Sequence, residues 1–214
     1  VRIPPKDKIV VQFHAGTQFI AYPLFYWTRF SRTGKMKLMD NFYISVAGAM
    51  GSGKTTTTRL LAEKLGFHLF EESVNENVFL PRYYENPKQW ALHSQLFYLR
   101  EKAEQLVKVK ALLSATSVIQ DTPIYQDCFT YAKAQHRLGY LSDEEFQLYL
   151  KYFQLLNKNL PVPDLVIQLD ASLPVLEQRI RQRGRDYEKN INGAYLQLLC
   201  DLQNEWLENN PDFP

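Results

Sequence analysis

The sequence predicts an α/β fold in which a mainly parallel sheet is flanked by helices on both faces. Short apolar segments rich in β-formers alternate along the chain with longer segments of helical periodicity, and strands that alternate with helices form parallel sheets. A glycine-rich stretch, GAMGSGKT, follows the first of these apolar segments. Open sheets of this kind bind ligands beyond the carboxyl ends of their strands, so we expect the functional residues to lie there.

Four segments are predicted to be strands. The first, residues 42–47 (FYISVA), is short, apolar and bounded by glycine, as buried strands are. The second and third end in acids, Glu72 and Asp121, which should therefore lie at the same sheet edge as the glycine-rich stretch. The remaining strands cover residues 67–72, 117–121 and 164–170.

Helices are predicted between these strands. Residues 53–65 should form a helix that ends at Gly66, because glycine favours the left-handed conformation of a helix C-terminus. Ser142 is followed three residues later by Glu145, and this capping box marks the start of a helix over residues 140–160. Further helical patterns cover residues 87–113, 174–184 and 195–208.

Composition narrows the class of protein. The chain has 214 residues, enough for one α/β domain, and a formal net charge of +2, which argues against a general polyanion-binding surface. Its most apolar early stretch, residues 19–27, is too short to cross a membrane. Two cysteines do not make a disulfide framework, so a reduced, cytoplasmic setting is expected. Neither a nucleic acid nor a membrane is expected as a partner.

The first 38 residues differ from the rest. Residues 1–40 carry seven Lys or Arg and two Asp or Glu, whereas the remainder carries 18 and 21. The change of charge falls just before the first predicted strand. We therefore expect residues 1–38 to be an N-terminal extension of unknown role and residues 39–214 to form the α/β domain.

The glycine-rich stretch matches the P-loop pattern GxxxxGK[ST] in full, with a strand before it and a helix after it. Such a loop points main-chain N–H groups at a phosphate, and the helix start adds its positive dipole end. The lysine reaches the β- and γ-phosphates, and the hydroxyl that follows ligates Mg²⁺. The expected ATP-binding residues are Gly48, Gly51, Ser52, Gly53, Lys54, Thr55 and Thr56.

Three further stretches narrow the choice of acceptor. EESVNENVFL (71–80), RYYENPKQWALHSQ (82–95) and RIRQRGRDYE (179–188) occur in order after the P-loop. Together these motifs resemble the deoxynucleoside kinase family, above all its bacterial purine and pyrimidine members, over about residues 40–208. The resemblance implies a P-loop kinase-type sheet and transfer of the ATP γ-phosphate to the 5′-hydroxyl of a deoxynucleoside in nucleotide salvage.

Roles follow from the resemblance position by position. Glu72 is similar to the carboxylate that accepts the proton of the 5′-hydroxyl, a task that suits a base beside an attacking alcohol. Its neighbour Glu71 leaves the register open by one residue. Tyr84 is expected to hydrogen-bond the sugar 3′-hydroxyl, and Gln95 to read the edge of the base, since an amide both donates and accepts.

Asp127 and Lys102 are expected to act as a pair. In the resemblance, Asp127 accepts from an amino-bearing base, and Lys102 takes the place of an arginine that pairs with it. This arrangement favours a purine or cytosine deoxynucleoside over thymidine. Tyr131 is expected to stack on the base.

An arginine-rich segment resembles the lid of the family. Arg179 and Arg183, four residues apart, share a helix face, and with Arg185 they would close over the transferring phosphate. Glu188 is similar to the lid carboxylate that touches the sugar 3′-hydroxyl. The metal ligands expected for Mg²⁺ are Thr55 and Asp121.

The chain departs from the family in two places. The third strand ends in Asp121-Thr122-Pro123, where the family has an acid, then Arg, then Ser; the acid is kept but the arginine near the 5′-oxygen is missing. A lid arginine could replace it, activity could be reduced, or the geometry could differ. The chain also stops at Pro214, before the fifth strand with which the family covers the adenine, so we expect a further C-terminal strand that this sequence does not contain.

Two alternatives stay open. A non-catalytic nucleotide-binding subunit of the same fold is favoured by the missing arginine at position 122. A nucleoside monophosphate kinase also uses a P-loop and an arginine-rich lid, but it needs extra cations for the acceptor's phosphate, and the DTP sequence lacks the usual Asp-Arg pair. The family's dimers imply a homodimer, with the helices 87–113 and 140–160 meeting across a two-fold axis.

Overall fold

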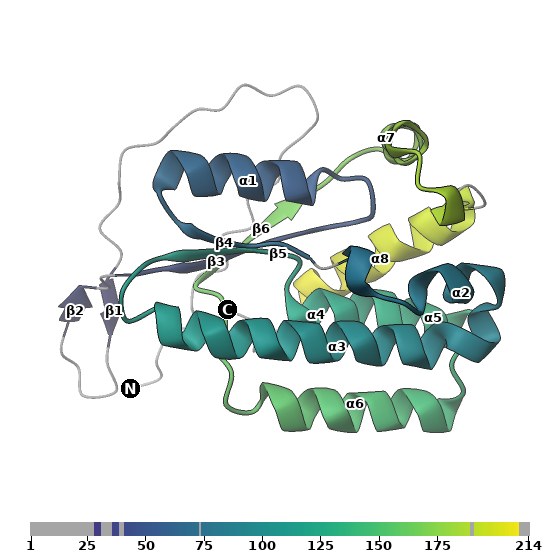
Figure 1. The fold of residues 1–214 in the computed structure, drawn as a ribbon, viewed down its shortest axis with the longest axis horizontal. Helices are drawn as coiled ribbons and strands as arrows, with labels where there is room; N and C mark the ends of the chain where they lie inside the picture. The colour runs from purple at the N-terminus through teal and green to yellow at the C-terminus, as the bar shows by residue number, and fades with distance from the viewer. Residues whose placement is uncertain (1–27, 31–35, 39–40, 73, 189–190, 210–214) are drawn as a thin grey trace.

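The computed structural model describes residues 28–30, 36–38, 41–72, 74–188 and 191–209 (Figure 1). The expected N-terminal extension and its boundary at residue 39 lie mostly outside these described residues, so both stay predictions. Two short strands of the extension are described: β1 (Thr28–Phe30) and β2 (Met36–Leu38), which pair antiparallel in a sheet of their own.

The main sheet has four strands in the order β4-β5-β3-β6, and every pairing in it is parallel. This confirms the predicted parallel sheet. The edge strand β4 ends at Phe70, earlier than predicted, so Glu72 lies two residues beyond the strand rather than in it. The four strands are β3 (Tyr43–Gly48), β4 (His68–Phe70), β5 (Val118–Asp121) and β6 (Leu165–Leu169).

The five predicted helices are all present. Helix α1 ends at Gly66, whose φ of 68° is the expected left-handed cap. The capping box of α6 is formed as predicted: the Glu145 N–H donates to Ser142 Oγ at 3.2 Å, and the Ser142 N–H donates to Glu145 Oε2 at 2.8 Å. None of the helices in the described ranges combines the length and apolarity that a bilayer span requires. The helices are α1 (Lys54–Leu65), α3 (Pro87–Leu112), α6 (Asp143–Asn157), α7 (Leu173–Arg183) and α8 (Gly193–Asn209).

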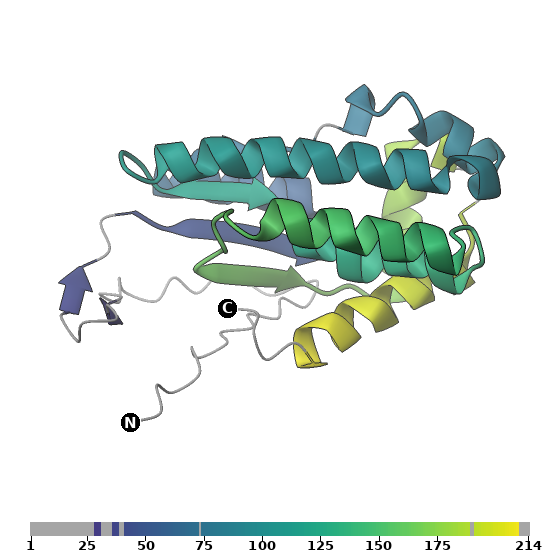
Figure 2. The same cartoon turned by 90° about the horizontal axis from the view of Figure 1, so that it is seen from below.

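Helices cover both faces of the sheet, as the sequence predicts. Figure 1 shows α1 on one face and α3 on the other, with α6 packed against the outer side of α3. The view from below in Figure 2 shows α3 and α6 running side by side under the strands. Helices α7 and α8 contact each other at the end of the sheet where the strands terminate.

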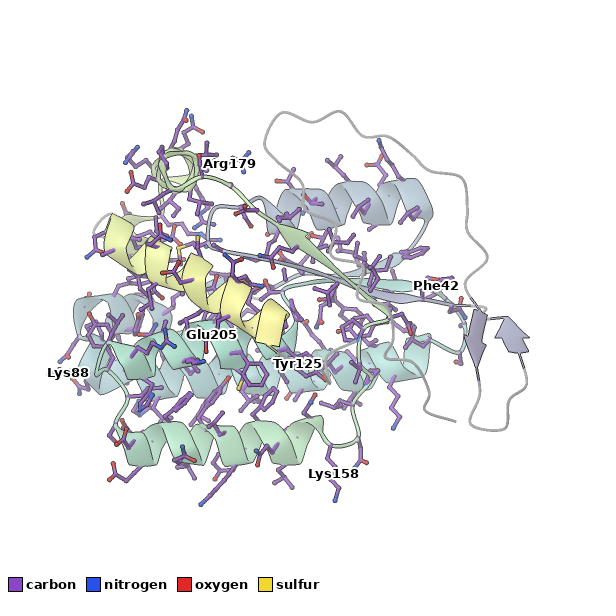
Figure 3. The ribbon with its side chains drawn as sticks, turned by 180° about the vertical axis from the view of Figure 1, so that it is seen from behind. Phe42, Lys88, Tyr125, Lys158, Arg179 and Glu205 are labelled. Atoms are coloured by element: carbon purple, nitrogen blue, oxygen red, sulfur yellow. The ribbon has the colours of Figure 1, made fainter. Side chains whose placement is uncertain are left out.

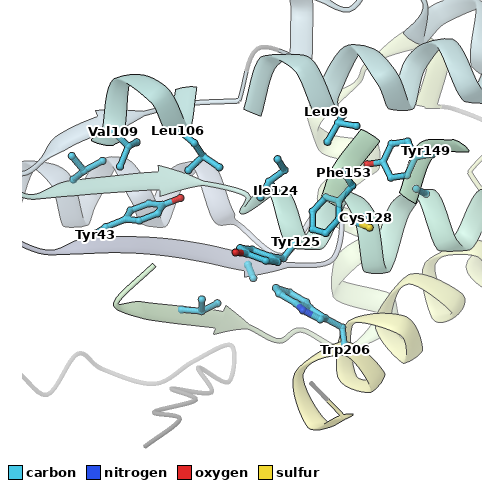
Figure 4. Close-up of a cluster of buried hydrophobic side chains, with 14 residues drawn as sticks. Tyr43, Leu99, Leu106, Val109, Ile124, Tyr125, Cys128, Tyr149, Phe153 and Trp206 are labelled. Carbon is cyan, nitrogen blue, oxygen red and sulfur yellow. The ribbon is translucent and has the colours of Figure 1, made fainter. Parts of the chain in front are cut away.

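The core has two layers, one on each face of the sheet, because successive side chains along a strand point to opposite faces. On β5, Val118 packs into the cluster beneath α3, whereas the next residue, Ile119, packs into the cluster beneath α1. Successive strand residues point to opposite faces, so a sheet covered twice needs apolar residues at both. Figure 4 shows the larger cluster, where Tyr43 of β3 meets Leu106 and Val109 of α3.

The segment between β5 and α6 is helical, which the sequence analysis did not predict. It contains a π-helical stretch, and a π-helix adds a residue per turn and so destroys the 3.6-residue periodicity that marks a helix. Stretches of this kind often occur at functional sites. The additional helical elements are η1 (Val74–Glu76), α2 (Leu80–Glu85), α4 (Ile124–Gln126), η2 (Asp127–Ala132), α5 (Lys133–Arg137) and η3 (Asp186–Glu188).

Candidate active site

A cavity of about 740 Å³ opens at the carboxyl ends of the strands. The loop after β3 forms one end of it, and side chains from the segment after β4, α2, α3, η2 and the α7–η3 segment form the rest. Most of the residues expected at the site line this cavity: Gly51, Ser52, Gly53, Lys54, Thr55, Thr56, Glu72, Tyr84, Gln95, Asp127, Tyr131, Arg179, Arg183, Arg185 and Glu188. Three others, Gly48, Lys102 and Asp121, lie behind its wall.

The loop after β3 turns because its glycines adopt conformations that other residues avoid. Gly48, Gly51 and Gly53 have φ values of 151°, 84° and 103°, and a Cβ on Gly48 would lie 2.6 Å from the carbonyl oxygen of Leu169. Lys54 Nζ donates to the Gly48 carbonyl at 2.8 Å. The loop thus surrounds an anion-sized space at the start of α1, as a phosphate-binding loop does.

Gln126 fixes the entrance to this loop, and the sequence analysis missed it. The Gly48 N–H donates to Gln126 Oε1 at 3.1 Å, while Gln126 Nε2 donates to the Gly48 carbonyl at 2.7 Å. Gln126 is fully buried. An amide carries its acceptor and its donors on separate atoms, so Gln126 can pair with both main-chain groups of Gly48 at once. No sequence signal identified this residue, because its partner lies 78 positions away.

Thr55 and Asp121 meet at the floor of the phosphate end. Thr55 Oγ1 donates to Asp121 Oδ2 at 2.5 Å, and Thr122 Oγ1 donates to Asp121 Oδ1 at 3.1 Å. A hydroxyl and a carboxylate beside a phosphate loop are the oxygen ligands that Mg²⁺ takes together with nucleotide phosphates, so the residues present fit that ion. Thr122 has a φ of 63°, a strained conformation for a β-branched residue.

Glu72, and not Glu71, faces the cavity. The Glu71 carboxylate is taken by Arg59, whose Nε and Nη2 donate to it at 2.6 and 2.7 Å. This ion pair lowers the pKa of Glu71. The structure therefore removes the one-residue ambiguity that the sequence left.

The expected pair between Lys102 and Asp127 is wrong. Lys102 Nζ donates to the main-chain carbonyl of Asp121 at 2.6 Å and lies 3.7 Å from Glu72 Oε1. Among the described residues, no ion pair within 4.0 Å joins Lys102 to Asp127. The reason is geometric: the lysine side chain ends in a point donor that reaches the end of β5, whereas the forked guanidinium of an arginine presents several donors at once.

Two buried polar atoms at the far end of the cavity have no hydrogen-bond partner within the described residues: Gln95 Oε1 and Asp127 Oδ2. Burial raises the pKa of Asp127 to about 8, against the opposing effect of the nearby Lys102 charge. Buried polar groups are nearly always paired in native proteins, so unpaired ones on a cavity wall indicate where a ligand binds. Tyr131 lies between this end and the lid and is partly buried.

The sugar-sized middle of the cavity is aromatic. Tyr84 of α2 stacks on Tyr187 of η3 with ring centroids 5.4 Å apart. Tyr83 also lines the cavity, and its hydroxyl donates to Gln135 Oε1, another wall residue, at 2.8 Å. Burial raises the pKa of Tyr84 well above its ordinary value, so its hydroxyl stays a hydrogen-bond donor at neutral pH.

The arginines of the α7 segment are arranged around two anchors. Arg179, labelled on α7 in Figure 3, donates from Nη1 to the Ser52 carbonyl of the phosphate loop at 3.0 Å. Arg183 and Arg185 both bind the carboxylate of Glu188, at 2.7 and 3.2 Å. Arg181, whose side chain is 71% exposed, lies 3.7 Å from Glu177.

Several residues on the cavity wall were not predicted. Tyr98 follows Gln95 by three positions on α3, so helical spacing alone could have suggested it. The others come from elements whose approach depends on tertiary packing. These further wall residues include Arg59, Ser94, Gln135 and Tyr195.

Comparison with known proteins gives a consistent result. The family model "Deoxynucleoside kinase" matches residues 44–214. The chain is 35% identical over 164 residues to a deoxyguanosine kinase from Bacillus subtilis (strain 168), covering 75% of this chain and 76% of the relative. It is 33% identical over 172 residues to a deoxyadenosine kinase from Dictyostelium discoideum, covering 80% and 69%.

A similar fold is found among solved structures. The structure of a deoxyadenosine kinase from M. mycoides, with the products dCMP and a flexible dCDP bound, superposes with a TM-score of 0.72 at 29% identity, covering 80% of this chain and 87% of that one. The same enzyme with bound dATP gives a TM-score of 0.71 at 27% identity, covering 81% and 88%.

Proposed function

The chain belongs to the deoxynucleoside kinase family and is a phosphotransferase, and we propose that it transfers the γ-phosphate of ATP to the 5′-hydroxyl of a purine or cytosine deoxynucleoside. One observation carries the proposal: a single cavity joins a phosphate-binding loop to a carboxylate, Glu72, and to unpaired polar atoms that a base could bind.

At the phosphate end, the main-chain N–H groups of the loop and Lys54 would hold the ATP phosphates. Thr55 and Asp121 would hold Mg²⁺, which neutralises charge on the phosphate oxygens when bound. Glu72 would accept the proton of the 5′-hydroxyl as that oxygen bonds to the γ-phosphorus and the bond to ADP breaks. Phosphoryl transfer depends mainly on position and charge, and these are what the wall residues supply.

The lid would take part through the release of its arginines. In the structure Arg183 and Arg185 both bind Glu188. A bound sugar hydroxyl would donate to the Glu188 carboxylate and leave at least one guanidinium free to neutralise the transferring phosphate. Arg179 is already held against the phosphate loop.

Base preference is inferred from the unpaired atoms at the far end. Gln95 Oε1 is an acceptor, and Asp127 Oδ2 lies on the same wall. An exocyclic amine supplies N–H donors for both. Thymine has no amine, and binding it would leave one of these buried atoms unpaired, which costs about 1–3 kcal/mol.

We extend the proposal to a homodimer in the cytoplasm that acts in nucleotide salvage. Support for the dimer comes from α6, where Leu155 is 70% exposed and Tyr152 is 46% exposed, together with Leu148 and Leu156. Contiguous apolar groups on a helix surface often mark contacts between subunits. Size-exclusion chromatography with light scattering tests this part, and a monomer at micromolar concentration contradicts it.

A phosphotransfer panel tests the proposed reaction. The purified chain, and a shorter version that begins at Met39, would be given ATP and Mg²⁺ with deoxyadenosine, deoxyguanosine, deoxycytidine or thymidine, and monophosphate formation would be followed by chromatography. We expect turnover of the amino-bearing nucleosides and little of thymidine. ATP binding without turnover of any nucleoside would favour a non-catalytic nucleotide-binding subunit. The absence of a cation at position 122 is the feature that supports this alternative.

A further inference from the structure

We propose that Lys102 is a positioning residue for phosphotransfer, which acts by holding the carboxylate of Glu72 in place rather than by reading the base with Asp127. The proposal rests on the proposed function, because it assigns to Lys102 a part in the step that Glu72 performs.

The surroundings of Lys102 show where its charge is directed. Its side chain is only 1% exposed, so the ammonium must be paired inside the protein. The partners of Nζ are the main-chain carbonyl of Asp121 at 2.6 Å and Glu72 Oε1 at 3.7 Å. The carbonyl is neutral, so Glu72 is the nearest negative charge to which this cation is joined.

Lys102 does not form part of the cavity wall, whereas Glu72 and Lys54 do. Lys54 is bound to the phosphate loop through the carbonyls of Gly48 and Ala49, where it faces the site of the phosphates. The two lysines therefore have different tasks. Lys102 does not line the cavity, and its contact with the Glu72 carboxylate on the cavity wall is the route by which we propose that it acts.

Helix α3 holds the segment after β4 at two points. Gln105 Nε2 donates to the main-chain carbonyl of Glu71 at 2.8 Å, and Lys102, three positions earlier, contacts the side chain of Glu72. Residues three apart lie on the same helix face. Since β4 ends at Phe70, the sheet does not fix Glu72, and the side chains of α3 do so instead.

The groups on the other side of the site do not compete with Glu72 for an ion pair with Lys102. Position 122, at the end of β5, carries a buried threonine and no cation. Among the described residues, Glu72 is the only acid whose carboxylate lies within 4.0 Å of Lys102 Nζ. Lys102 thus supplies the fixed positive charge beside the proton-accepting carboxylate.

A pair of double-mutant cycles tests the proposal. Lys102→Met would be combined once with Glu72→Gln and once with Asp127→Asn, and kcat and KM would be measured for deoxyadenosine and deoxycytidine. Small displacements of a catalytic group cost up to about 10²-fold in rate. We expect Lys102→Met alone to lower kcat by about 10- to 100-fold, with KM changed less than threefold, and to have no further effect when Glu72 is already Gln.

Two further variants complete the test. Lys108→Met removes an exposed lysine of the same helix and should leave kcat unchanged. Lys102→Gln keeps a donor for the Asp121 carbonyl but removes the charge, and it serves if Lys102→Met does not fold; the same loss, masked by Glu72→Gln, is expected.

Three results would overturn the proposal. Unchanged kcat in both Lys102 variants means that the charge is not needed. A change in the preference between the two nucleosides that disappears in the Asp127→Asn background means that Lys102 serves the base after all. Absence of turnover in the unaltered chain contradicts the proposed function itself, and the role of Lys102 falls with it.

Discussion

The phosphate end of the cavity is made of main chain, and the acceptor end is made of side chains. Residues 50–57, from the turn between β3 and α1 and the first turn of α1, line the first. The second collects Glu72, Gln95, Asp127 and Glu188 from four separate segments. The glycine loop depends on backbone conformations that few substitutions allow. Side chains on a cavity wall can instead form different pairs, as Lys102 does with Glu72 rather than Asp127. The two ends should therefore fail in different ways when altered.

The largest effect on activity is expected at the acceptor end. Glu72→Gln removes the proton acceptor while keeping the shape of the side chain, so kcat should fall by about 10²–10⁴-fold. ATP binding, measured by calorimetry, should stay as it is because the phosphate loop is untouched. Full activity in this variant would contradict the role of Glu72.

Glu71→Gln is the matched control. The Glu71 side chain is 40% exposed and pairs with Arg59, whose side chain is 61% exposed. Exposed ion pairs contribute little to stability, so this variant should keep nearly full activity. If Glu71→Gln lost as much activity as Glu72→Gln, the assignment of the base would have to move by one residue.

The phosphate end should respond by losing stability. Gly48→Ala places a Cβ 2.6 Å from the Leu169 carbonyl at a φ of 151°, so β3 and β6 must move apart. We expect the free energy of unfolding to fall by about 2–4 kcal/mol, which lowers Tm by roughly 10 °C in a chain of this size. Thermal unfolding followed by circular dichroism measures the change.

Gly139→Ala is a control that measures the cost of backbone strain without a steric clash. Gly139 also has a positive φ, 68°, but a Cβ there meets nothing within 4 Å. Its cost should be the left-handed conformation alone, about 1–2 kcal/mol. Equal losses in the two glycine variants would mean that the contact with Leu169 is relieved by a small shift.

Gln126 links the two ends, because η2 begins at the next residue, Asp127. Gln126→Glu loses the donor to the Gly48 carbonyl and places a carboxyl oxygen against it, so we expect a loss of about 1–3 kcal/mol in stability and a higher KM for ATP. The exposed Gln154 of α6 gives the control Gln154→Glu, which should change neither quantity. An unaltered KM for ATP in Gln126→Glu would show that the loop holds its shape without the clamp.

The acceptor end should also show a pH-dependent stability, because burial raises the pKa of Asp127. The folded chain holds the Asp127 proton up to about pH 8, whereas an unfolded chain releases it near pH 4. The stabilising contribution of the bound proton is therefore complete below about pH 4 and is lost as pH rises towards 8. Asp127→Asn is neutral throughout, so its free energy of unfolding should fall less between pH 5 and 8 than that of the unaltered chain. If the free energy of unfolding changed equally in both proteins across pH 5, 6.5 and 8, the result would contradict the raised pKa of Asp127.

The two ends of the cavity also differ in how far their residues could be predicted from the sequence. The P-loop was predicted residue by residue because it needs closely spaced glycines between a strand and a helix, and both are local patterns. Glu72, Tyr84 and Gln95 were assigned by resemblance, since their spacing reflects no local rule. Gln126, which clamps the phosphate loop, and Tyr195 of α8, which lines the cavity, were missed because each takes its place only when distant segments pack together.

By itself the sequence determined the order of strands and helices, the parallel sheet and the phosphate loop. Hydrophobic periodicity and glycine positions are patterns within about ten residues. The features named above depend on such local patterns, so the sequence predicts them. Only the tertiary structure decided that Glu72 and not Glu71 faces the cavity, that the segment holding Asp127 is π-helical, and that Lys102 turns to Glu72. The position of Lys102 depends on which charged group is nearest once the interior is closed to water, where an unpaired charge is too costly to leave.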